Sequence, residues 1–144
     1  MSSTSIKPPT WFWVVSVIVL LWNLMGVSSY LMQAYTSIEQ LEAMSQAERA
    51  LYENQPAWVT ACFAIAVFSG TIAAIGLLLR KKWARPVFII SLLTATAQFI
   101  HWLFVTNSVE VYGSEAYIMP ALVIIFGIYE IYFAKKGIKK GWLR

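Results

Sequence analysis

Four apolar segments dominate this sequence, at about residues 11–35, 58–79, 86–106 and 117–134. The hydrocarbon core of a bilayer is about 30 Å thick and an α-helix rises about 1.5 Å per residue, so each segment is long enough to cross it. Hydrophobic residues make up 59% of the 144 residues and charged residues only 12%, which is far from the composition of a water-soluble domain. The sequence therefore predicts an all-α fold, with one integral membrane domain over residues 1–144 built as a four-helix bundle.

The basic residues predict how this bundle is oriented. Ten of the 11 Lys and Arg residues lie before the first segment, between the second and third, or after the fourth, and only Arg49 lies elsewhere. Because Lys and Arg near membrane ends are retained on the cytoplasmic side, we expect both termini to be cytoplasmic. The links 36–57 and 107–116 then face outward, and they carry six glutamates against Arg49. The formal net charge of +4 thus indicates a membrane anchor, so we expect the lipid bilayer as a partner and no nucleic acid.

The first outward link predicts two short helices. Ser37 with Gln40, and Ser45 with Glu48, match the capping-box pattern of a helix N-terminus. Pro56 prevents the second short helix from continuing into the second membrane segment. Such a link is either a simple connector or a lid over the outward mouth of the bundle.

Small residues on the second segment predict close helix packing. Ala66, Gly70 and Ala74 recur every four residues, with Ser69 and Ala73 on the adjacent row. In lipid, such a stripe lets a neighbouring helix approach closely. We expect it to pack within the bundle, in preference to forming a homodimer face.

Polar side chains inside the apolar segments are the candidate binding residues. The first segment carries Asn23, Tyr30 and Gln33 on one face. The third carries Gln98 and His101, the only histidine of the chain, three residues apart on one face towards the outward half of the membrane. We call these five residues the polar seam.

Two interpretations of the polar seam are open. In the structural one, His101 donates to a backbone carbonyl or to Tyr30 or Gln33, and Gln98 bonds to Asn23, which fixes the register of the helices. In the functional one, the seam lines a cavity towards the acidic outward face and binds a proton, a cation or a polar head group. A metal site is not expected, because one histidine without a nearby cysteine or aspartate falls short of the usual ligand set.

Glu130 is a further candidate, as the only acidic residue within a membrane segment. At the helical rise it lies about 6 Å from the cytoplasmic end of the fourth segment, too far below His101 for direct proton transfer. We expect either an ion pair with Arg80, Arg85 or Lys135 or a proton or ion relay through the polar seam.

No catalytic residue is predicted. The sequence has no hydrolytic triad motif, phosphate-binding glycine loop, Cys-x-x-Cys pair or paired catalytic carboxylates. Its single cysteine, Cys62, excludes an intrachain disulfide. An enzymatic role is therefore not favoured, and only a bound cofactor, whose identity the sequence does not specify, would supply redox chemistry.

Three stretches carry a resemblance to known proteins: WFWVVSVIVLLWNLMGVSSYLMQAY, NQPAWVTACFAIAVF and LLLRKKWARPVFIISLL. Over about residues 7–93, and most specifically in WNLMGV, QPAW and RKKWA, the chain resembles a group of small, mostly proteobacterial inner-membrane proteins, some of them labelled automatically as sugar transporters. It is also distantly similar to DoxX-type membrane proteins. The resemblance implies a multi-pass protein of the bacterial inner membrane with a periplasmic link between its first two spans, and it implies no substrate and no functional residue.

The predicted function is that of a small integral inner-membrane protein that binds a lipid, a quinone or a small polar ligand, or that assists a larger membrane complex. The alternative is a small transporter or channel for a sugar, an ion or another small solute. Four helices enclose only a narrow path, so transport would require a homo-oligomer. A membrane redox enzyme is a third interpretation.

Overall fold

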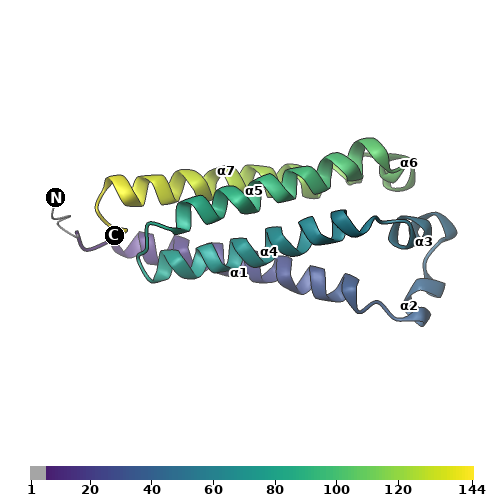
Figure 1. The fold of residues 1–144 in the computed structure, drawn as a ribbon, viewed down its shortest axis with the longest axis horizontal. Helices are drawn as coiled ribbons and strands as arrows, with labels where there is room; N and C mark the ends of the chain where they lie inside the picture. The colour runs from purple at the N-terminus through teal and green to yellow at the C-terminus, as the bar shows by residue number, and fades with distance from the viewer. Residues whose placement is uncertain (1–5) are drawn as a thin grey trace.

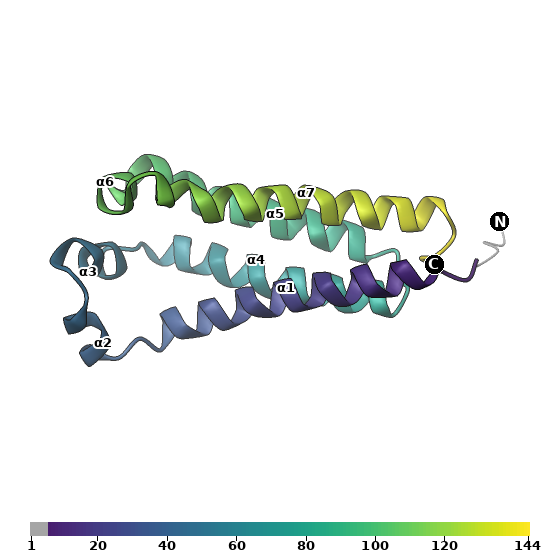
Figure 2. The same ribbon diagram turned by 180° about the vertical axis from the view of Figure 1, so that it is seen from behind.

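Four long helices run alongside one another for most of the length of the molecule (Figures 1 and 2). The computed structural model describes residues 6–144, and no β-strand occurs in that range. The long helices are α1 (Thr10–Ala34), α4 (Ala57–Leu78), α5 (Ala84–Ile100) and α7 (Ile118–Lys139). The shorter elements are α2 (Ile38–Ala43), α3 (Gln46–Glu53), the π-helix η1 (His101–Val105), α6 (Ser108–Tyr112) and the 3-10 helix η2 (Gly113–Tyr117). The prediction of an all-α fold with four long apolar helices is confirmed.

The outer surface of the four long helices is apolar. Each helix is long and apolar enough to cross a membrane when α5 is taken together with η1 and α7 together with α6 and η2. Large apolar side chains cover the outside, and Met32, Leu93 and Phe104 are 72%, 64% and 80% exposed. In water such a surface would be unfavourable, whereas against acyl chains it is the expected one. These are the features of a multi-pass membrane protein.

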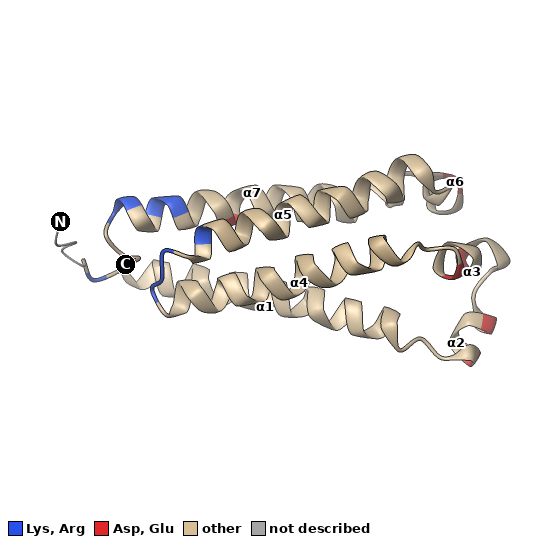
Figure 3. Ribbon diagram, viewed as in Figure 1, with Lys and Arg blue, Asp and Glu red and all other residues tan. Residues whose placement is uncertain are grey.

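Charged residues of the described chain lie at the two ends of the molecule, with the exception of Glu130 within α7 (Figure 3). The end that holds the start of α1 and the C-terminus, which we call the basic end, carries Lys7, Arg80, Lys81, Lys82, Arg85, Lys135, Lys136, Lys139, Lys140 and Arg144. The opposite end, which we call the acidic end, contains α2, α3, α6 and η2 and carries Glu39, Glu42, Glu48, Glu53, Glu110 and Glu115 together with Arg49. The fold thus gathers the basic segments of the sequence at one end, although they lie far apart along the chain.

A core of large side chains fills the bundle at the basic end. Phe12 of α1 stacks on Phe133 of α7 with ring centroids 5.4 Å apart, and Trp142 packs edge-on against Phe12. Leu77 and Phe88 complete this core from α4 and α5, with exposures of 0% and 1%. The helices are therefore closely packed where the chain begins and ends.

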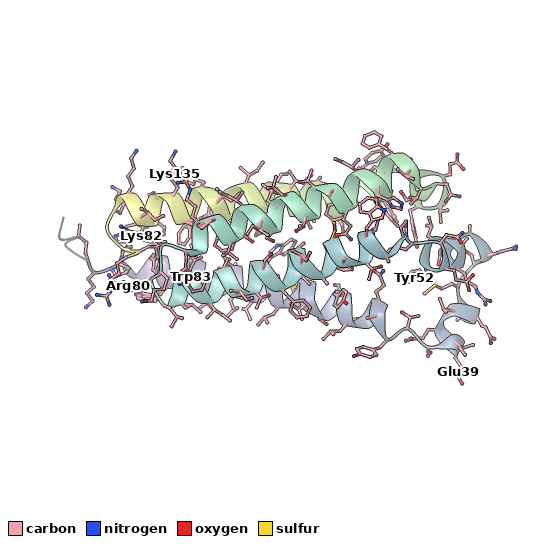
Figure 4. All side chains as sticks on the ribbon, in the orientation of Figure 1. Glu39, Tyr52, Arg80, Lys82, Trp83 and Lys135 are labelled. Atoms are coloured by element: carbon pink, nitrogen blue, oxygen red, sulfur yellow. The ribbon has the colours of Figure 1, made fainter. Side chains whose placement is uncertain are left out.

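Arg80 links Ile6 and the C-terminal residues to the turn between α4 and α5. It has a left-handed backbone, with φ 58°, at a helix terminus where glycine is usual. Its Nε donates to the Trp142 carbonyl and its Nη2 to the Ile6 carbonyl, each at 2.9 Å. The Arg144 backbone N–H donates in turn to the Arg80 carbonyl at 2.9 Å. Figure 4 shows Arg80 with Lys82 and Trp83 at this end of the molecule.

The stripe of small residues on α4 packs inside the bundle, as predicted. Ala66, Gly70, Ala73 and Ala74 are all buried, and α4 packs against both α1 and α5. Ser91 of α5 approaches closely enough for its hydroxyl to donate to the Ala66 carbonyl at 2.7 Å. The small side chains therefore bring α5 near the α4 backbone.

The two short helices predicted in the first link are present as α2 and α3. At α2 the capping box is complete, since the Gln40 N–H donates to Ser37 Oγ at 3.1 Å and the Ser37 N–H donates to Gln40 Oε1 at 2.9 Å. At α3, Ser45 Oγ accepts from the Glu48 N–H at 3.2 Å. Pro56 is the N-cap of α4 and separates it from α3.

Helices α5 and α7 reach beyond the apolar segments that predicted them. α5 begins at Ala84, so that Pro86 lies in its first turn. The N–H groups of a first turn have no acceptor within the helix, so the lack of an N–H at Pro86 costs no hydrogen bond. α7 continues past Ala134 to Lys139, because lysine is a good helix former. Gly141, with φ 78°, then turns the chain away from the helix axis.

Candidate ligand cavity

A buried polar pair joins α1 to α7 inside the bundle. The Asn23 amide Nδ2 donates to Glu130 Oε1 at 3.2 Å and to the Val19 carbonyl at 2.8 Å. Asn23 is 8% exposed and Glu130 is 4% exposed. Gly70 of α4 makes room for the amide, because a Cβ at that position would lie 2.1 Å from Asn23 Oδ1. The Asn23 side chain can therefore take this position only because residue 70 is a glycine, which has no side chain.

The predicted ion pair of Glu130 with a basic residue is wrong. Neither Arg80, Arg85 nor Lys135 forms a salt bridge with Glu130 in the described part of the chain. Glu130 is buried towards α1, whereas Lys135 is exposed and points away from the bundle (Figure 4). The Arg80 guanidinium bonds to main-chain carbonyls at the basic end. The buried Asn23 amide thus partners the carboxyl group in place of a cation.

A cavity of about 350 Å³ lies between the four long helices, on the side of this polar pair that faces the acidic end. We call it the central cavity. Its walls are mainly apolar, with Asn23 at the inner end and Gln98 towards the acidic end, and Trp22 stacks on Phe126 of α7 with centroids 4.3 Å apart. It is lined by Trp22, Asn23, Met25, Gly26, Ser29, Phe63, Ala66, Val67, Ser91, Ala95, Gln98, Phe99, Met119 and Val123. In both views of the ribbon, α1 diverges from α7 towards the acidic end (Figures 1 and 2).

Two further cavities, of about 380 and 340 Å³, lie at the acidic end. We call them the mouth cavities, and both are lined by Gln55, Gln98 and Trp102. Gln98 also lines the central cavity, so it lies where all three meet. Leu51 of α3 lines the larger mouth cavity. The link between α1 and α4 is therefore part of the cavity wall, which favours the lid interpretation over a simple connector.

The side chains of Gln98 and His101 have no hydrogen-bond partner among residues 6–144. His101 is 7% exposed and packs edge-on against Trp58, with ring centroids 5.4 Å apart. Both residues line the larger mouth cavity, as their spacing of three residues on one helix face predicts. Their polar atoms thus remain available to a molecule in the cavity.

The interhelical hydrogen bonds of the structural interpretation are therefore not formed. Gln98 does not bond to Asn23, because the Asn23 amide is directed to Glu130. His101 does not bond to Tyr30, whose ring packs edge-on against Phe63 with centroids 5.5 Å apart. The structure thus pairs Asn23 with Glu130, and it brings Gln98 and His101 to one cavity.

Gln33 lies at the rim of this region. It lines the smaller mouth cavity together with Gln98, and it shares a separate cavity of about 170 Å³ with Tyr30 and Gln55. No hydrogen bond joins Gln33 to His101 in the described residues. The polar seam is therefore connected through cavities and not through direct side-chain bonds.

Two features of the mouth were not predicted from the sequence. Gln55 lines both mouth cavities and donates from Nε2 to Thr60 Oγ1 at 2.8 Å, but it lies outside the apolar segments. Gln55 lies immediately before Pro56, at the start of α4, and this position in the sequence could have indicated that it lies at the mouth of the bundle. The second feature is the π-helix η1, in which Trp102 donates from Nε1 to the Ala116 carbonyl at 3.2 Å. π-Helical turns are frequent at functional sites.

Metal-binding residues do not cluster in this site. Within residues 6–144 there is no group of three or more His, Cys, Asp or Glu side chains that could hold an ion. Cys62 is a free thiol on α4. The site offers amide, imidazole and aromatic groups instead.

Comparison with known proteins adds no family to these observations. No protein-family model, curated protein or solved structure matches this chain. The cavity and its polar groups are therefore the basis on which a function is argued.

Proposed function

We propose that this protein binds an amphipathic molecule, such as a lipid or a quinone, between its four helices. The observation that carries the proposal is that Gln98 and His101 lie in a helix apolar enough to cross a membrane, have no hydrogen-bond partner in the described chain, and face a cavity. Unpaired polar groups at membrane depth are unfavourable, and they are retained where they contact a ligand, an ion or water. A molecule with a polar head and an apolar body satisfies both these side chains and the apolar central cavity.

The shape of the interior supports binding over passage. The central cavity has a volume of about 350 Å³, within the range of small-molecule sites. At the basic end, Phe12, Phe88 and Phe133 fill the bundle with exposures of 0% or 1%. A solute crossing the membrane would have to displace this core, so a transporter or channel is the less favoured function.

The charge separation supports an orientation for the proposed protein. We assign the basic end to the cytoplasm, since cytoplasmic loops carry an excess of Lys and Arg. The mouth cavities then open at the periplasmic surface of a bacterial inner membrane, the location that the resemblance to small proteobacterial proteins implies. In this orientation the head group of the ligand lies in the outer leaflet.

Native mass spectrometry of the detergent-purified protein tests the proposal. The wild type is expected to retain a bound amphipathic molecule. Ser29→Phe is expected to abolish retention, because Ser29 lines the central cavity at an exposed edge where a large ring would obstruct it. Ser28→Phe is the matched control, since Ser28 is exposed on the same helix and lines none of the cavities described here.

Two results contradict the proposal. One is a wild-type protein that retains no such molecule and takes none up from added lipid extract or ubiquinone. The other is equal retention by Ser29→Phe and Ser28→Phe, which would mean that the molecules bind to the outer surface of the helices.

A further inference from the structure

The mouth cavities are lined by carboxamide side chains. These are Gln33, Asn54, Gln55, Gln98 and Asn107. Each carboxamide presents both a donor NH₂ group and an acceptor oxygen, and the imidazole ring of His101 adds ring nitrogens that form hydrogen bonds. Of these amides, Gln55 uses its NH₂ group on Thr60. The lining is therefore complementary to a group that both donates and accepts hydrogen bonds.

Neither mouth cavity is lined by a Lys or Arg residue. Arg49, the basic residue of this end, forms a salt bridge with Glu53 at 2.8 Å, and the hydrogen bond and charge of Glu53 hold the pKa of Arg49 above its ordinary value. Glu115, by contrast, lines the smaller mouth cavity. Phosphate and carboxylate groups are recognised most strongly by Arg and Lys, so an anionic head group would find hydrogen-bond donors here but no Lys or Arg.

A head group that only accepts hydrogen bonds also fits poorly. It would leave the amide oxygens of Gln98 and Gln33 and the carboxylate of Glu115 without donors. Glu115 is exposed at the rim, so solvent screens its charge and it does not by itself require a cation. The complementary group is uncharged and carries hydroxyl groups.

We infer that the bound amphipath has an uncharged, hydroxyl-bearing head group held by Gln98 and His101, and that anionic phospholipids, which meet no Lys or Arg in the mouth, bind less tightly. The inference rests on the proposed function and adds the chemistry of the head group. The apolar part of the molecule extends into the central cavity, where Asn23 is the innermost polar residue.

Three probes with one oleoyl chain separate the head-group chemistries. Monooleoylglycerol donates and accepts hydrogen bonds, lysophosphatidic acid adds a phosphate to the same molecule, and methyl oleate only accepts. The probes are added in equal amounts to delipidated protein, and the bound species are counted by native mass spectrometry. We expect monooleoylglycerol to exceed each of the others by about tenfold, the effect of one or two neutral hydrogen bonds.

Gln98→Leu tests the assigned residue. Because the Gln98 side chain bonds to no residue among 6–144, its loss removes no bond of the fold. The preference for monooleoylglycerol over methyl oleate is expected to fall several-fold. Thr94→Val is the matched control on α5, since the Thr94 hydroxyl bonds only to carbonyls of its own helix, at 2.9 and 3.0 Å from those of Ile90 and Ser91.

The outcomes distinguish the inference from the proposed function. If all three probes bind equally and Ser29→Phe abolishes all binding, the cavity binds amphipaths but the head-group inference is overturned. Tighter binding of lysophosphatidic acid overturns it as well. If neither the probes nor added lipid extract or ubiquinone bind, or if Ser29→Phe leaves binding unchanged, the proposed function itself is overturned.

Discussion

Replacing Gly70 by alanine should disrupt the buried polar pair by adding a single methyl group. The new Cβ would lie 2.1 Å from Asn23 Oδ1 and 3.0 Å from Asn23 Cγ, so the amide has to move. Its movement lengthens the 3.2 Å bond to Glu130, a residue that is 4% exposed. One substitution on α4 thus weakens the hydrogen bond that joins α1 to α7.

The expected cost follows from three contributions. Overpacking an interior costs about 1–3 kcal/mol, and a buried polar group that loses its partner costs about 1–3 kcal/mol. Alanine gains up to about 1 kcal/mol over glycine in a helix, which offsets part of this. We expect Gly70→Ala to lower the free energy of unfolding by about 1–5 kcal/mol, with the upper part applying if the amide cannot find another partner.

A double-mutant cycle measured by SDS-induced unfolding in mixed micelles checks the mechanism. In an Asn23→Ala background the clashing amide is absent and the 3.1 Å contact of the new Cβ with Ser91 Oγ remains, so Gly70→Ala should cost clearly less than in the wild type. Gly127→Ala is the matched control, because its Cβ would meet Leu92 Cδ1 at 2.7 Å, the movable end of a flexible side chain. An equal loss of stability from Gly70→Ala with and without Asn23 would refute the reasoning.

Three further predictions concern the basic end, the buried carboxyl group and the orientation. Arg80→Ala should destabilise the protein by about 1 kcal/mol more than Arg80→Gly in the same unfolding assay, because both lose the guanidinium contacts but only alanine keeps the cost of a left-handed backbone; equal losses would contradict this. Glu130→Gln keeps an acceptor for the buried amide and should stay within about 1 kcal/mol of the wild type, whereas Glu130→Leu should lose about 1–3 kcal/mol, and the reverse order would argue against the hydrogen bond. In a Cys62→Ala background, Lys140→Cys should react with a membrane-impermeant maleimide only after the cells are opened and Glu42→Cys in intact cells; the opposite pattern would invert the proposed orientation.

The local features of the fold could be predicted because each depends on a few neighbouring residues. Ser37 and Gln40 cap α2 through bonds that span three positions, so the sequence is sufficient to identify them. The burial of Ala66 and Gly70 followed from their spacing, since one helix face must pack against its neighbours in lipid. The four long helices could be predicted from the length and apolar composition of their segments, because both are properties of consecutive residues.

The partners of the polar side chains could not be predicted, because they depend on how the helices are aligned. Asn23 and Glu130 are 107 residues apart, and a shift of one helical turn would have brought Glu130 to a different side chain. The π-helix at His101 and the left-handed backbone of Arg80 also lack a sequence signal, since neither position holds a glycine or proline. The polar residues were thus identifiable from the sequence, whereas their contacts required the structure.

The packing of the C-terminal residues into the core at the basic end has a consequence for biosynthesis. Trp142 and Leu143, which are 7% and 1% exposed, follow all four membrane helices in the chain, yet they pack into the same core as Phe12. During synthesis the four long helices are therefore made before the residues that complete this core. The packing at the basic end can form only after Trp142 and Leu143 have left the ribosome. A product shortened before Trp142 cannot complete this core and should therefore be more open to proteolysis at its basic end.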